Sequence, residues 1–148
     1  MVSRPVFSLM ISGIFALTPG ALHSQGRPYT EGSVWELTMV RTTAGMQDDY
    51  LRSLVITWRR IHEEAKQQGL VLSYTVLVAD ASGDDDWDVM LMVEYKNWAA
   101  LDGVASKFEP IEQRIVGNQE QSHQLMTQRL EIRRILGTKH AQELILKP

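Results

Sequence analysis

Apolar and polar positions along the chain predict strands that alternate with helices. Val34 to Thr42 is rich in β-forming residues and alternates as a strand does. From Met46 to Gln68 the apolar residues recur at helical spacing, and Gly69 follows where a glycine commonly ends a helix. The first part of the chain therefore predicts a strand, a tight turn and a long helix.

The second part of the chain predicts a hairpin and further helices. Leu70 to Ala79 and Trp87 to Lys96 read as strands joined by a polar loop, and they should pair with each other. Asn97 suits the N-cap of a helix from Trp98 to Phe108, which Pro110 interrupts. Helical patterns and a short final strand follow at 111–116, 119–136 and 141–147.

This order of elements, β-α-β-β-α-(α)-β, favours one arrangement. Right-handed crossovers lead to the split βαβ, or ferredoxin-like, α+β sandwich with an antiparallel four-stranded sheet. The first and third strands are then central and adjacent, and the helices cover one sheet face. A further C-terminal helix precedes the last strand.

Alternation along the strands predicts which side chains lie beneath the helices. The set assigned to that side is apolar: Trp35, Leu37, Met39, Leu70, Leu72, Tyr74, Val76, Val78, Trp87, Val89, Leu91, Val93 and Tyr95. The opposite set mixes apolar and polar residues: Val34, Glu36, Thr38, Val40, Val71, Ser73, Thr75, Leu77, Asp88, Met90, Met92 and Glu94. A face of that kind marks an interface, so we expect a homodimer whose two sheets face each other across a semi-polar cavity.

The Thr-Thr-Ala-Gly turn after the first strand and the Tyr-Lys-Asn-Trp entry to the second helical region carry a resemblance. With the element order, they look like the dimeric α+β barrel superfamily, which includes antibiotic-biosynthesis-monooxygenase-like and NIPSNAP-like proteins. The resemblance spans Val34 to Lys147 and implies two sheets closed into a barrel with helices outside. It leaves the activity open, because that fold hosts haem-degrading oxygenases, cofactor-free oxygenases and isomerases.

Residues 1–26 have the layout of a secretory signal peptide. Arg4 precedes an uncharged apolar run from Val6 to Leu17, and Thr18-Pro19-Gly20 ends the run. The run is shorter than the roughly 20 residues of a membrane span. We therefore expect an exported protein, periplasmic or extracellular, with no membrane association after cleavage. Residues 27–33 are then a linker and residues 34–148 the domain.

Composition narrows the classes of function. The 148-residue chain has a net charge of −3, which argues against binding nucleic acid because the phosphates require a basic surface. It has no cysteine, so disulfides, thiolate metal ligands and cysteine nucleophiles are excluded. Neither a Gly-rich phosphate loop nor a G-x-S-x-G motif is present.

Glu36 and Glu94 are the candidate catalytic residues. If the first and third strands are adjacent and both side chains face the cavity, the two carboxylates approach each other. Such a pair raises one pKa and supplies an acid or a base. The alternative is that both are hydrated at the rim of the barrel. Residues predicted to line the ligand cavity are Thr38, Ser73, Thr75, Met90, Met92 and His62, the last of which is otherwise a hydrogen-bonded core histidine.

The sequence predicts no metal site and no cofactor. Histidines are not arranged as HxH, HxxxH or HExxH, and the predicted helix from Trp98 to Phe108 offers no histidine ligand for haem. Asp84, Asp86 and Asp88 match the start of a calcium loop, but Val89 stands where that loop needs glycine. An acidic turn is the simpler interpretation.

Three functions remain open. The chain is an exported dimer that binds a small, partly apolar molecule between its sheets, a cofactor-independent oxygenase or isomerase that uses the paired carboxylates, or a purely structural dimer with a filled barrel.

Overall fold

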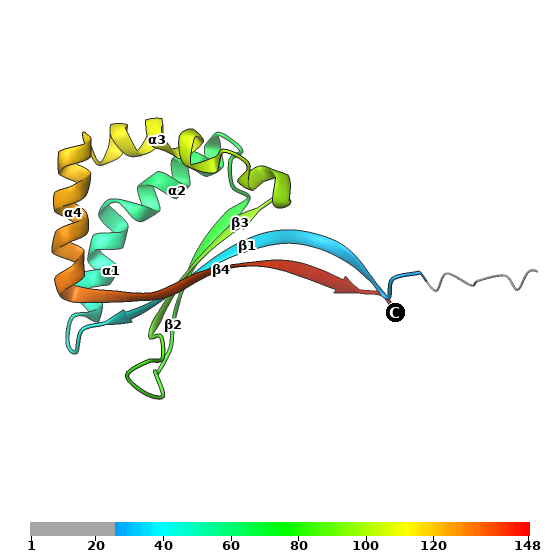
Figure 1. Cartoon of the computed structure of the whole chain (residues 1–148), viewed down its shortest axis with the longest axis horizontal. Helices are drawn as coiled ribbons and strands as arrows, with labels where there is room; N and C mark the ends of the chain where they lie inside the picture. The colour runs from blue at the N-terminus through cyan, green and yellow to red at the C-terminus, as the bar shows by residue number, and fades with distance from the viewer. Residues whose placement is uncertain (1–25) are drawn as a thin grey trace, which may run out of the picture.

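The computed structural model describes residues 26–148 (Figure 1). The predicted signal peptide therefore lies outside the described residues except for Gly26. The elements are β1 (Tyr29–Thr42), α1 (Gln47–Ile56), α2 (Trp58–Gln67), β2 (Ser73–Val78), β3 (Val89–Tyr95), a 3₁₀ turn η1 (Trp98–Leu101), α3 (Val104–Ile115), α4 (Gln119–Ile132) and β4 (Arg133–Leu146). Within this range, no helix has the length and hydropathy needed to cross a membrane.

The four strands form one sheet in the order β2-β3-β1-β4, and every neighbouring pair is antiparallel. With two central strands, β1 and β3, and helical connections on one side, this is the ferredoxin-like α+β fold that the sequence predicts. β1 and β4 are each 14 residues long and extend past the helices as a two-stranded ribbon (Figure 1). The extra helix, α4, stands between α3 and β4.

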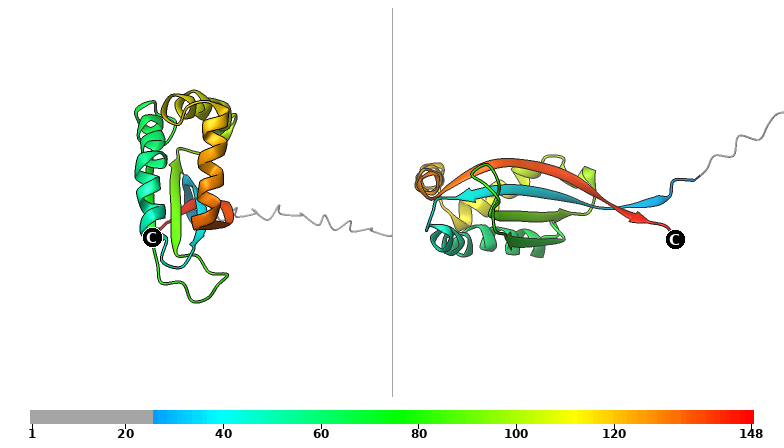
Figure 2. Two further views of the ribbon diagram at one scale, coloured as in Figure 1. Left: turned by 90° about the vertical axis from the view of Figure 1, so that its left-hand side faces the viewer. Right: turned by 90° about the horizontal axis from the view of Figure 1, so that it is seen from below.

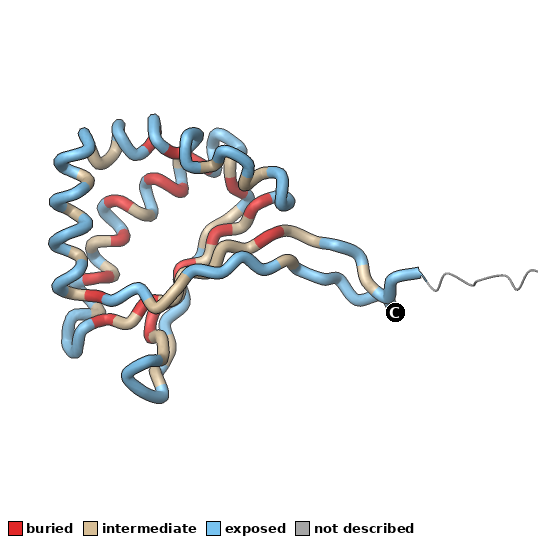
Figure 3. Tube along the Cα trace, in the orientation of Figure 1, coloured by how far each residue is buried: buried red, intermediate tan, exposed pale blue. Residues whose placement is uncertain are grey.

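Helices α1 and α2 cover one face of the sheet and bury two apolar clusters (Figures 2 and 3). One cluster joins the amino-terminal half of β1 to α2 and α3 through Val34, Ile61 and Ile111. The other joins the far end of β1 to α1 through Val40 and Leu54. Burial of these side chains contributes roughly 1.5–3 kcal/mol each and fixes the helices on this face.

The long helix predicted from Met46 to Gln68 is two helices. They are separated at Thr57, whose hydroxyl donates to the carbonyl oxygen of Ser53 at 3.2 Å. The local hydrogen bond replaces part of the helical ladder, and the chain turns between α1 and α2. The predicted end of the helix is confirmed: Gly69 has φ +72°, a conformation that favours glycine.

The helical region after β3 differs from the prediction at Pro110. Asn97 caps η1, as expected, by accepting a hydrogen bond from the backbone of Ala100. Pro110 does not interrupt α3, which runs from Val104 to Ile115. Pro110 and Ser106 are both exposed, so water can solvate the carbonyl of Ser106 that lacks a helical donor.

The last strand is longer than predicted. Helix α4 ends at Ile132 rather than at residue 136, and Arg133 begins a strand that pairs with β1. The strand predicted at 141–147 is only its second half. Likewise β1 begins at Tyr29, inside the predicted linker 27–33. Each long strand satisfies the backbone groups of the other, and this pairing outweighs the helical pattern of residues 133–136.

The predicted faces are correct for β3 and β2 and wrong for β1. In β3, Val89, Leu91, Val93 and Tyr95 are buried beneath the helices, as expected. Residues opposite each other in an antiparallel pair share a face, and Glu36 lies opposite Val93. The side chains of β1 beneath the helices are therefore Val34, Glu36, Thr38 and Val40. Trp35, Leu37 and Met39 lie on the other face, with Met90 and Met92. Val71, assigned to the open face, is buried in the core.

Candidate ligand site between the helices and the sheet

Two adjoining hollows lie on the helix side of the sheet. One, of about 240 Å³, is lined by residues of β1, α2, β3 and α3, among them Glu36, Tyr95 and Phe108. The other, of about 230 Å³, lies between α2, α3 and α4 and includes Ile61 and Arg129 in its wall. Three residues line both hollows: Trp58, His62 and Glu112. In Figure 1, α2, α3 and α4 lie above β1 and β4, and α4 leads directly into β4.

The polar middle of β1 contributes to the floor of this region. The carboxylate of Glu36 lies 3.2 Å from Nε2 of His140, which is its neighbour on β4. Two residues along, the hydroxyls of Thr38 and Thr138 are 3.0 Å apart. The side chains of Glu36 and His140 remain 31% and 39% exposed, so the pair is open to a ligand. A carboxylate beside an imidazole can accept and donate protons.

Aromatic rings form the wall opposite this floor. Trp58 and His62 are one turn apart on α2, and their ring centroids lie 4.3 Å from each other. Phe108 of α3 lies 5.6 Å from the ring of His62. Tyr95 closes the end of β3, where burial, followed by the nearby charge of Glu36, raises the pKa of its hydroxyl. The Tyr95 hydroxyl therefore stays protonated and can donate a hydrogen bond.

His62 is held in one tautomer. Nδ1 lies 2.8 Å from the carbonyl oxygen of Trp58, which can only accept, so Nδ1 carries the proton. Burial lowers the pKa of the imidazole, and the ring is neutral at pH 7. Nε2 is thus the unprotonated nitrogen of a histidine that lines both hollows. The arrangement supplies a hydrogen-bond acceptor within an otherwise aromatic wall.

Arg129 of α4 is the one cation that lines the hollow between α2, α3 and α4, which we call the upper hollow. Its Nη2 donates to the carbonyl oxygen of Ser53, at 3.2 Å, and to the hydroxyl of Thr57. These contacts fasten α4 to the junction between α1 and α2. Desolvation by burial lowers the pKa of the guanidinium, which stays protonated because its ordinary pKa is so high.

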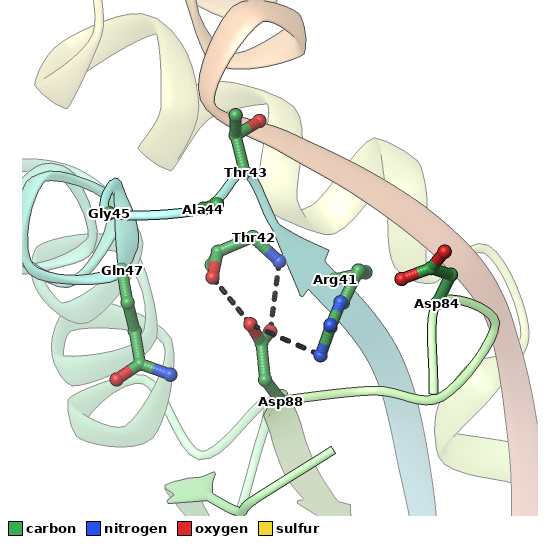
Figure 4. Close-up of a pocket in the computed structure, with 8 residues that line it drawn as sticks. All are labelled: Arg41, Thr42, Thr43, Ala44, Gly45, Gln47, Asp84 and Asp88. Carbon is green, nitrogen blue, oxygen red and sulfur yellow. Dashed lines mark hydrogen bonds and ion pairs between the residues drawn. The ribbon is translucent and has the colours of Figure 1, made fainter. Parts of the chain in front are cut away.

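A third depression, of about 430 Å³, lies where β1 meets the turn before α1 (Figure 4). Its central group is Asp88, which accepts hydrogen bonds from the backbone N–H of Thr42, at 2.9 Å, and from the Thr42 hydroxyl. Arg41 lies 3.9 Å from the same carboxylate. Because these partners already satisfy the carboxylate, we interpret Asp88 as a structural residue whose hydrogen bonds hold the end of the β2–β3 loop against β1.

The carboxylates predicted to form a catalytic pair do not meet. Glu36 lies beneath the helices, whereas Glu94 lies on the open face, opposite Trp35. Glu94 accepts a hydrogen bond from the hydroxyl of Ser73 at 2.6 Å. The predicted acid–base pair is therefore wrong, because β1 has the opposite orientation to the one its alternation predicts.

The predicted ligand residues are divided between the two faces of the sheet. Thr38 and His62 are on the helix side, and His62 lines both hollows. The other four lie together on the open face: Ser73, Thr75, Met90 and Met92. Any cavity that these four residues line requires a second molecule to cover them.

Several residues of the hollows escaped the sequence analysis. Neither Trp58 nor His140 belongs to a motif that marks it as a site residue. The Glu36–His140 contact follows from the register of β1 with β4, which could not be predicted while β4 was expected to start at residue 141. Arg129 is one polar residue among many on α4, and no pattern separates it from them.

The acidic segment before β3 is organised as a turn. Asp86 accepts from the backbone N–H and the hydroxyl of Ser82, at 2.9 and 2.7 Å, while Asp85 pairs with Arg134. In the part of the chain from residue 26 onward, no group of three or more His, Asp or Glu side chains is placed to hold a metal ion.

No family model and no curated protein matches the chain. One solved structure that it resembles is described as a dimeric ferredoxin-like protein from an uncultured marine organism. The two share 14% sequence identity with a TM-score of 0.49, over 80% of this chain and 99% of the other.

Proposed function

We propose that this protein binds a small, partly apolar molecule in these two adjoining hollows, one of which lies against β1 and the other between α2, α3 and α4. The observation that carries the proposal is the polar interruption of β1. Its helix side is fully buried at Val34 and Val40, but Glu36 between them stays partly exposed beside His140. A carboxylate placed under helices is costly unless water or a ligand reaches it.

The side chains that line the hollows indicate the shape and polarity of the ligand. Trp58, His62 and Phe108 offer aromatic surfaces, which suit a flat apolar body. Glu36 accepts hydrogen bonds and Tyr95 donates one, so both hydroxyl and carbonyl groups of a ligand would find partners. Hollows of about 230 and 240 Å³ suit a molecule of one or two fused rings.

The proposal includes a homodimer that closes through the open face of the sheet. That face carries Trp35, Leu37, Met39, Met90 and Met92, all half-buried in a single chain. Glu94 on β3 and Lys139 on β4 give the same face one charge of each sign, so it is complementary to a second copy of itself. A face this apolar on one protomer is best explained by a partner that covers it.

Titration with 2-naphthol tests the binding proposal. We expect a dissociation constant of roughly 0.1–1 mM by calorimetry, which is ordinary for about ten heavy atoms. Trp58→Phe should weaken binding several-fold, because a smaller ring leaves part of the wall empty. The matched control is Trp87→Phe, which changes a tryptophan outside both hollows. Absence of saturable binding, or equal loss in both variants, contradicts the proposal.

Sedimentation velocity tests the dimer. The full-length protein should sediment as a dimer over the accessible concentration range. A single monomeric species at every concentration would remove the second copy from the proposal and leave the open face unexplained.

A further inference from the structure

Arg129 is a cation without an acid partner inside an apolar hollow. Around it, the upper hollow is lined by Ile61, Leu125 and Met126. None of the ion pairs formed between residues 26 and 148 includes Arg129. Arg129 is half-buried, and taking a charge out of water is expensive unless an opposite charge compensates it.

The hydrogen bonds that Arg129 makes account for only one of its nitrogens. Nη2 donates to Ser53 and Thr57, two neutral acceptors that hold the helix junction. Nε is buried and has no partner in the described chain. A guanidinium used only to join helices would leave its charge and most of its donors unused.

The charges around Arg129 increase the cost of leaving it unpaired. Burial is the main cause that lowers the pKa of Arg129, Tyr50 opposes that shift, and repulsion from the nearby charge of Arg133 adds to it. Arg133 itself is buried, stacks on Tyr50 at 5.7 Å, and has an unpartnered Nε. The carboxylate that does line the hollow, Glu112, is exposed on α3, where solvent screens it. The junction of α4 and β4 is therefore positive.

We infer that the molecule bound in these hollows is an organic carboxylate with an apolar body, and that the guanidinium of Arg129 binds its carboxylate. The inference rests on the proposed function and names the class of ligand. The apolar body lies along Trp58 and Ile61, and the charged end points toward α4. A charge-assisted hydrogen bond to the carboxylate supplies the counter-charge that the protein itself does not provide.

Two naphthalenes that differ in charge test the inference. At pH 7, 2-naphthoate is an anion and 2-naphthol is neutral, while the apolar bodies are identical. We expect 2-naphthoate to bind the full-length protein about tenfold more tightly than 2-naphthol. Arg129→Gln should remove that preference, so that 2-naphthoate and 2-naphthol bind the variant with similar affinity. Arg52→Gln, which removes the same charge from an exposed site on α1, is the matched control and should leave both affinities unchanged.

The outcomes separate the two proposals. Equal affinity for both compounds overturns the carboxylate inference and leaves the proposed function standing. Binding of neither compound overturns the proposed function itself. If Arg129→Gln still prefers 2-naphthoate, another group binds the carboxylate. Arg129 then has a structural role only, and the inference is overturned.

A measurement on the unmodified protein keeps the test valid if Arg129→Gln does not fold. The Nε–H resonance of Arg129 in an ¹⁵N-labelled sample should shift with 2-naphthoate and stay in place with 2-naphthol. A resonance that ignores both compounds while calorimetry detects binding contradicts the inference.

Discussion

The two central strands of the sheet, β1 and β3, differ in what they place beneath the helices. On β3 the four helix-side residues are all apolar or aromatic and all buried. On β1 Val34 and Val40 behave in this way, but Glu36 and Thr38 lie between them. The helices therefore pack on β3 along its whole length but leave the middle of β1 open. The hollow that Glu36 lines occupies that position.

The largest expected effect is the loss of core packing on β3. Leu91 is 8% exposed, and Leu91→Ala should lower the free energy of unfolding by about 2–4 kcal/mol through lost transfer energy and an added cavity. Urea denaturation measures it. The control, Leu130→Ala on the exposed surface of α4, should change stability by less than about 0.5 kcal/mol. Equal effects from the two variants would show that β3 is not the packed strand.

The open face of β1 should respond to substitution through the dimer. Leu37 lies at the middle of the open face, beside Met92 and Lys139. A second ammonium from Leu37→Lys should weaken the dimer by about 100-fold, through burial of charge and repulsion. Sedimentation at several concentrations measures the change. Val55→Lys, a similar change on the exposed side of α1, is the control, and a dimer that is lost only in that variant contradicts the proposed interface.

The sequence predicts the faces of β2 and β3 but not those of β1. Alternation gave the correct faces for β3 and β2, because the helix side of each is apolar. It failed on β1, where the apolar set Trp35, Leu37 and Met39 lies on the open face. The proposed dimer accounts for this pattern, because β1 would then pack its apolar side against the partner and leave its polar side under a hollow. Within one sequence, nothing distinguishes that strand from an ordinary amphipathic strand.

The residues that α4 and β4 contribute to the site could not be predicted from the sequence for another reason. The helical pattern continued to residue 136, so the predicted strand began eight residues late and His140 had no place in the sheet. Long-range pairing with β1 decided this boundary, and pairing of that kind leaves no local signal.

Stability should depend on pH through His62. Because burial lowers the pKa of the folded imidazole below its ordinary value of 6.5, the folded state binds fewer protons than the unfolded state. Stability is therefore complete above about pH 6.5 and falls as the pH drops, by at most about 1.4 kcal/mol per pH unit. Urea midpoints at pH 5 and pH 7 measure the slope. His62→Phe should flatten it, whereas His123→Gln, at an exposed site on α4, should leave it as in the parent protein.

The smallest expected effect on stability is at Glu36. Its contact with His140 keeps both side chains about one third exposed, so Glu36→Leu should change the free energy of unfolding by no more than about 0.5 kcal/mol. The same variant should weaken 2-naphthol binding by about 2–10-fold through loss of a hydrogen-bond acceptor. Calorimetry and urea denaturation on one sample give both numbers. A large loss of stability with unchanged binding would mark Glu36 as a core residue.

The position of a bound ligand tests the central claim, which is that the helix side of β1 is open and binds the ligand. A crystal of the protein soaked with 6-bromo-2-naphthol would reveal the bromine by its anomalous scattering. We predict a peak between α2 and β1, next to Trp58 and His62. A peak between two facing sheets, beside Met90 and Met92, would contradict the account and place the ligand on the opposite side of the sheet.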